Sequence, residues 1–139
     1  YLDVSSEDIL DSYMRAYQYR KSRIEPLYYI AHYFRKKEDF NSGYLTAKLA
    51  QMVPISQDIL FVQQWMYDYG VQLEISVCAY WIEKYEECQK ISLDLLKRNN
   101  LPPNVRTCIE NNLGFANAKL LEQIYNKNFT QNLPSPLME

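Results

Sequence analysis

The amino-acid sequence predicts an all-α fold, a short stack of about six to seven helices arranged as antiparallel pairs. Apolar residues recur at helical spacing through most of the 139 residues, and no alternating run with turn signals indicates a strand. Three glycines and six prolines leave long helical windows, because the prolines fall at segment edges and in the tail. One two-helix pattern also recurs 45 residues further along the chain.

The clearest helix pair is predicted between residues 24 and 55. Pro26 suits the first turn of its first helix, and Pro54 ends its second helix, because a proline ring cannot follow a helical residue. A polar turn from 35 to 39 joins the two helices. Small residues at Ala31 and Gly43 are predicted to let the two backbones approach closely. The inward positions are Leu27, Ile30, Ala31 and Phe34 on the first helix, and Phe40, Gly43, Ala47 and Ala50 on the second.

A second unit is predicted near residues 69–100, because the same frame recurs there. The repeated positions are Ile75, Ser76, Ala79, Tyr85 and Cys88, which stand 45 residues after Ile30, Ala31, Phe34, Phe40 and Gly43. We expect an insert at residues 56–66 between the units. This insert is predicted to be a short helical or extended piece that places Leu60 and Phe61 under the second pair.

Capping helices are predicted on both sides, at residues 5–18 and 104–126. The second carries an apolar stripe expected to close the stack: Val105, Ile109, Leu113, Ala116, Leu120 and Ile124. Residues 1–126 are therefore expected to form one helical repeat domain. Residues 127–139 contain two prolines and little periodicity, so they are predicted to be a tail or linker.

The first pair resembles a tetratricopeptide repeat, in which large and small residues alternate along two short helices before a closing proline. The matching positions are Leu27, Ile30, Ala31, Phe34, Gly43, Ala47 and Pro54. Glu38 and Glu83 stand at the two turns, where such repeats commonly carry a glycine. The shift of 45 residues exceeds the usual period of about 34, so the insert lengthens the unit.

A more specific set of residues lies between about Ala16 and Phe115. It includes Asp58 with Leu60-Phe61-Val62, Tyr67 and Tyr69, Glu74 and Ser76, and Ala79-Tyr80. This order resembles the helical repeat region that accompanies family-2-type glycosyltransferase domains in some bacterial and giant-virus proteins. The resemblance implies an accessory domain beside a catalytic domain. Transferases of that type bind metal through an Asp-x-Asp motif on an α/β fold, and this chain has neither the motif nor predicted strands.

Three functions are consistent in different degrees with these residues. The first is a non-catalytic accessory domain that positions a partner, an acceptor or a neighbouring domain of a larger glycosyltransferase protein. The alternative is a free-standing tetratricopeptide-type adaptor that binds peptides. The third, an enzyme, is disfavoured because His32 is the only histidine and no cysteine or carboxylate pair stands at ligand spacing with it. We therefore expect no catalysis, cofactor or metal in this segment.

Candidate partner-binding residues follow from the expected stack, in which the first helix of each pair lines the concave side. They are Tyr28, His32 and Arg35 on the first unit, and Leu73, Val77 and Tyr80 on the second. The expected partner is a protein, a peptide or an adjacent glycosyltransferase domain. The alternative, that the end helices cover this face, stays open, and the sequence does not give the oligomeric state.

Charge and cysteine usage exclude other classes. A net charge of −2 gives no overall attraction to nucleic acid. The longest apolar run, residues 75–82, is too short to span a membrane. The chain begins without methionine and is expected to be part of a longer protein. Cys78, Cys88 and Cys108 lack metal-binding spacing and are expected to be reduced core thiols of a cytoplasmic protein. Glu74 is expected to be a buried carboxylate paired with an arginine such as Arg20 or Arg23.

Overall fold

The computed structural model describes residues 6–19, 24–53 and 64–132. The described residues form six α-helices and one π-helix, with no strand among them, which confirms the all-α prediction. In chain order they are α1 (Ser6–Tyr19), α2 (Glu25–Lys36), α3 (Phe40–Gln51), the π-helix η2 (Met66–Gly70), α4 (Val71–Trp81), α5 (Tyr85–Leu96) and α6 (Pro103–Asn132).

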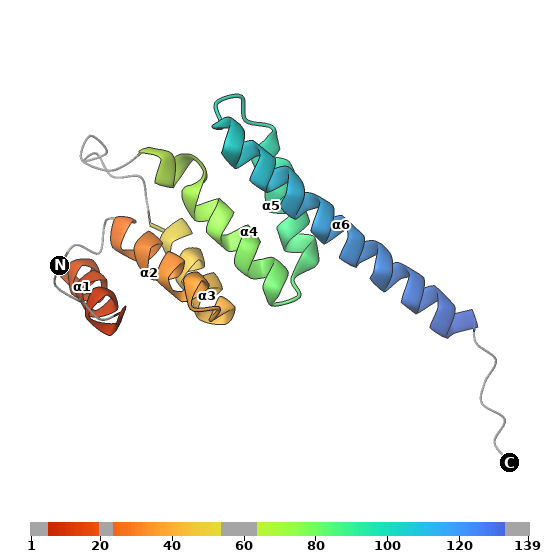
Figure 1. Ribbon diagram of the computed structural model, residues 1–139, viewed down its shortest axis with the longest axis horizontal. Helices are drawn as coiled ribbons and strands as arrows, with labels where there is room; N and C mark the ends of the chain where they lie inside the picture. Colours follow the sequence, from red (N-terminus) through yellow and green to blue (C-terminus); the bar gives the residue numbers. More distant parts are fainter. Residues whose placement is uncertain (1–5, 20–23, 54–63, 133–139) are drawn as a thin grey trace, which may run out of the picture.

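The helices are arranged in chain order, with α1 against α2, α2 against α3, and so on to α6 (Figure 1). In addition α4 touches both α2 and α6, and these three helices lie on one side of the molecule (Figure 1). The last helix extends well beyond the others (Figure 1). This layout fits a short stack, and its closer likeness to tetratricopeptide pairs stays a prediction.

The structure repeats with the same shift of 45 residues as the sequence. Helices α3 and α5 span Phe40–Gln51 and Tyr85–Leu96, which differ by that shift at both ends. The turns before them are also equivalent, because Glu38 and Glu83 have positive φ angles of 61° and 67°. After each turn a backbone N–H returns to the preceding helix, from Asp39 to Phe34 O at 2.9 Å and from Lys84 to Ala79 O at 2.8 Å.

Gly43 lies where helices approach one another closely. A Cβ atom at this position would lie 3.3 Å from the carbonyl oxygen of Ala31, which confirms the predicted close contact between α2 and α3. It would also lie 2.9 Å from Cys78 Sγ on α4. Three helices therefore meet at one glycine, and only the absence of a side chain allows the contact.

The core consists of three groups of buried side chains. The first lies between α2, α3, η2 and α4, and the second between α4, α5 and α6. The third lies where the end of α5 meets the start of α6. Their buried members are Ile24, Leu27, Ala31, Ala47, Ala50, Met66, Val71 and Ile75 in the first, Ala79, Cys88 and Ala116 in the second, and Leu95, Leu101 and Ile109 in the third.

Several expectations need correction. The last helix continues to Asn132, so the first residues of the predicted tail are helical. Its apolar stripe does not stay inward, because Ile109 and Ala116 are buried whereas Ile124 is exposed. Phe34 and Phe40 are only half-buried. Cys108 is exposed and not a core thiol, unlike Cys78 and Cys88.

The predicted insert falls largely on residues 54–63, outside the described ranges, as does the proposed placement of Leu60 and Phe61. What the structure does describe is the entry to α4, which begins as the π-helix η2. Within the described ranges, no helix combines the length and the apolar character that crossing a membrane requires.

Candidate interaction surfaces

A charged cluster joins α2 to α4. Glu74 is buried, and its two carboxylate oxygens accept hydrogen bonds from Arg35, at 2.6 Å from Nε and 3.1 Å from Nη2. Burial works against the charged guanidinium, but the hydrogen bond and the charge of Glu74 outweigh it, so the pKa of Arg35 is raised. The expectation of a buried carboxylate paired with an arginine is thus confirmed. The partner is Arg35, whereas Arg20 and Arg23 lie outside the described residues.

His32 completes this cluster. Its Nδ1 atom lies 2.9 Å from Glu74 Oε1 and 3.0 Å from Arg35 Nη2. One ring nitrogen cannot donate and accept at once, so Nδ1 either donates its proton to Glu74 or accepts one from Arg35. Two of the predicted partner-binding residues are therefore engaged inside the fold.

Tyr28 lies beside the cluster among other aromatic rings. Its ring centroid is 6.1 Å from that of His32 and 5.1 Å from that of Trp65, which precedes η2. The ring of Trp65 packs over Gly70, where a Cβ atom would lie 2.7 Å from it. Burial first, and the nearby Glu74 second, raise the pKa of Tyr28 to about 12. Tyr28 thus packs against the core, and its phenol stays protonated at neutral pH.

An aromatic patch occupies one end of α4, where α3, α4 and α6 come together. We define it by Phe40, Tyr80, Trp81 and Phe115. Trp81 stacks on Phe40 with ring centroids 5.3 Å apart, and Tyr80 lies 6.3 Å from Phe115. Trp81 and Phe115 remain 59% and 58% exposed. Large aromatic side chains that are both ordered and exposed are typical of protein interfaces.

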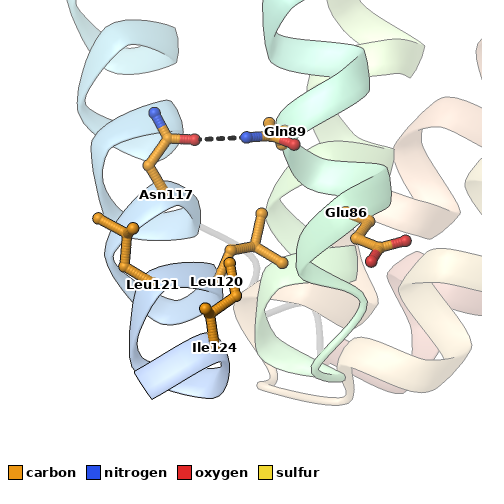
Figure 2. A pocket seen from close by; sticks show the side chains of 6 residues that line it. All are labelled: Glu86, Gln89, Asn117, Leu120, Leu121 and Ile124. Carbon is orange, nitrogen blue, oxygen red and sulfur yellow. Dashed lines mark hydrogen bonds between the residues drawn. The ribbon is translucent and has the colours of Figure 1, made fainter. Parts of the chain in front are cut away.

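A groove lies between α5 and the second half of α6, and Figure 2 shows the side chains that line it. They are Glu86 and Gln89 on α5, and Asn117, Leu120, Leu121 and Ile124 on α6. Its volume is about 600 Å³. Gln89 donates a hydrogen bond of 2.8 Å to Asn117 and so ties the two walls together. Apolar side chains from α6 make up half of this lining, which suits an apolar occupant.

The six predicted partner-binding residues do not form one open surface. Tyr28 and Leu73 pack against core groups, and Tyr80 packs against the group formed by α4, α5 and α6 while it also borders the aromatic patch. His32 and Arg35 belong to the charged cluster, and Val77 is half-buried. The structure thus brings together Tyr28, His32 and Arg35, and leaves Tyr80 next to the aromatic patch.

Sequence reasoning named Tyr80, Leu120 and Ile124, but it did not assign Trp81, Phe115 or Leu121 to a surface. Trp81 lies at the end of α4, and Phe115, near the middle of α6, lies beside Tyr80, the neighbour of Trp81, because α4 packs against α6. Leu121 lies outside the periodic stripe of α6, so no pattern within its own helix marks it. The pairing of His32 with Glu74, 42 residues apart, could have been predicted from the repeat. The first helices of two successive repeat units stack against each other in a fixed register.

Among the described residues, no group of three or more histidine, cysteine or acidic side chains is placed to hold a metal ion. Burial first, and Glu74 second, raise the pKa of the Cys78 thiol to about 12, which leaves it protonated and unreactive. Comparisons with protein-family models, with curated proteins and with solved structures find no match for this chain.

Proposed function

We propose that this chain is a non-catalytic, helical-repeat interaction domain that serves a glycosyltransferase as an accessory part of a larger protein. The observation that carries the interaction role is the aromatic patch, in which Trp81 and Phe115 are exposed on packed helices. The association with a glycosyltransferase rests on the resemblance of the connecting residues described above.

The charges on the α2–α4 side favour docking of a folded domain over capture of an extended peptide. A peptide carboxylate would need a free guanidinium, but Nε and Nη2 of Arg35 already donate to Glu74. The aromatic patch offers large apolar rings that can bury against a second folded surface. An adaptor for peptides is therefore the weaker alternative.

The test is association in trans. The chain and a family-2-type catalytic domain from the same protein are produced as separate polypeptides, and their affinity is measured by calorimetry. The paired change Trp81→Ala and Phe115→Ala should weaken binding by about 10- to 100-fold, because aromatic anchors dominate interface energies. Circular dichroism must show unchanged helix content.

Leu45→Ala provides the matched control, because Leu45 is also a large exposed apolar residue but lies on α3 outside the patch. It should leave affinity unchanged. Equal affinity for the parent and the patch variant would refute the assignment of this surface. The non-catalytic role itself would be refuted if the purified chain turns over a nucleotide sugar and this activity remains after a second purification.

A further inference from the structure

The last helix, α6, is longer than α5, the helix against which it packs. Helix α5 has 12 residues and α6 has 30, which correspond to lengths of about 18 Å and about 45 Å. The two run antiparallel, since Gln89 bonds to Asn117 while Glu86, one turn earlier, lines the groove with Leu120. The start of α5 at Tyr85 is thus level with the region just after Leu120. The rest of α6 projects past α5 (Figure 1).

The segment of α6 that follows Leu120 is apolar on the side that continues the groove. Leu121 and Ile124 are 67% and 56% exposed, and Tyr125 beside them is exposed as well. A polar outer face is what keeps the terminal unit of a helical stack soluble, and an apolar one indicates that something covers it. The groove and this segment together form a continuous surface that could hold one further helix.

Charge identifies the occupant. Glu86 is the only charged residue among the six that line the groove. Lys127 follows Ile124 by three residues, so it lies on the same side of α6. Within the described part of the chain, neither Glu86 nor Lys127 forms an ion pair. The surface therefore carries the acid Glu86 where α5 begins and the base Lys127 towards the free end of α6, and these opposite charges can pair between two copies.

We propose that a second copy of this chain covers the surface, with the two α6 helices antiparallel about a two-fold axis between Leu121 and Ile124. In such an arrangement the same patch serves on both subunits. The projecting segment of each copy fills the groove of the other. Lys127 of the second copy comes level with residue 118, about two residues or 3 Å from the level of Leu120 and Glu86. Two equivalent ion pairs between Glu86 and Lys127 close the interface.

The two-fold arrangement pairs Glu86 and Lys127 of both copies at once, which a head-to-tail contact with α1 does not. The self-association surface is also distinct from the aromatic patch. Phe115 and Leu121 are six residues apart, which separates them by about 120° around α6.

The experiment measures the mass of the chain by sedimentation equilibrium across the micromolar range, with reducing agent present because Cys108 is exposed. The parent chain should change from monomer to dimer as concentration rises, since a small interface gives weak association. Leu121→Glu with Ile124→Glu should remain monomeric, with unchanged helix content. Leu45→Glu, an exposed leucine on α3, is the control and should dimerise like the parent.

Charge reversal tests the register. Glu86→Lys and Lys127→Glu should each weaken the dimer, and the double variant should restore it, because both ion pairs re-form with opposite sense. A chain that is monomeric throughout, or a dimer indifferent to the changes at Leu121 and Ile124, would overturn the proposal. The proposal would also be overturned if the chain itself is monomeric and the changes at Leu121 and Ile124 abolish its binding to a different protein. The Trp81 and Phe115 variant should still dimerise, which separates this inference from the proposed function.

Discussion

At the scale of single residues, Glu74 is decisive, because among the described residues it is the only charged residue that is buried. Removing an ion from water is costly, and the cost is offset here by Arg35 and His32 on a different helix. The cluster therefore fixes the register of α2 against α4. It also gives Arg35 a structural role, whereas the partner-binding role expected from its position stays a prediction.

Arg35→Ala should lower the free energy of unfolding by about 3–5 kcal/mol, because it leaves the Glu74 carboxylate buried without its main partner. Urea unfolding followed by circular dichroism measures the change. Arg15 provides a control, since its ion pair with Asp11 is exposed and Arg15→Ala should cost less than about 1 kcal/mol.

A second variant separates charge from packing at this site. Adding Glu74→Gln to the Arg35→Ala background should recover part of the lost stability, because an amide is cheaper to bury than an unpaired carboxylate. If the double variant is as unstable as the sum of both single changes, the two side chains act independently and the proposed coupling is wrong.

The two turn glutamates make another residue-scale prediction. Glu38 and Glu83 are held at φ of 61° and 67°, a left-handed conformation that costs an ordinary residue about 1–2 kcal/mol. Glycine accepts this conformation freely, so Glu38→Gly and Glu83→Gly should each raise the melting temperature. Glu110→Gly, an exposed position inside α6, should lower it, since glycine weakens a regular helix. Equal effects at all three sites would contradict this account.

At the scale of elements, the positions of the helices in the two pairs could be predicted from the sequence, whereas the arrangement at the ends of the stack could not. The apolar stripe of α2 and the polar turn before α3 are local signals. The structure adds that Asp39 accepts a hydrogen bond from the Ser42 backbone N–H at the start of α3. The continuation of α6 past its partner depends on where α5 begins, which no residue within α6 encodes. The same is true of the entry to α4, where the π-helix accompanies the packing of Trp65 on Gly70.

Glycine-to-alanine changes test which helices are packed closely. Gly43→Ala should destabilise the fold by about 1–3 kcal/mol, because the new methyl group meets Cys78 and the backbone of Ala31. Gly114→Ala on α6 meets nothing within 4 Å and should stabilise by about 1 kcal/mol through helix propensity. Thermal melts of the two variants should therefore shift in opposite directions. A shift of the same sign in both would show that α3 is not held against α2 and α4 as described.

At the scale of the whole molecule, stability should fall at alkaline pH. The pKa values of Cys78, Tyr28 and Tyr44 are raised to about 12 in the fold, chiefly by burial, from ordinary values of 9.0 for the thiol and 10.0 for the phenols. In the unfolded chain these groups lose their protons earlier. Between pH 9 and 12 the unfolded state therefore binds fewer protons, and the free energy of unfolding decreases as pH rises.

Unfolding in urea at a series of pH values from 8 to about 11 measures this slope. The contribution of these three groups to the free energy of unfolding should be fully present below pH 9. Tyr28→Phe should flatten the slope above pH 10, because one titrating phenol is gone. A slope unchanged by Tyr28→Phe would show that this phenol titrates alike in both states.

Much of the architecture was predictable from the sequence, but the surfaces were not. The repeat at 45 residues gives the order of the helices and the small residue at Gly43, because these depend on neighbours along the chain. The aromatic patch and the groove depend on how the helices pack against one another. Tyr80 was identified in advance only because it is offset from the buried stripe, while Trp81 beside it was not.

The packing of helices in chain order has a consequence for how the protein folds. Each helix finds its main partners in the adjacent helices, so most contacts close short loops and little chain entropy opposes their formation. Helix α4 is the element that links both halves, because it touches α2 and α3 on one side and α5 and α6 on the other. A structure built in this way can fray at either end without losing the rest, and α4 should be the last segment to exchange its amide hydrogens with solvent.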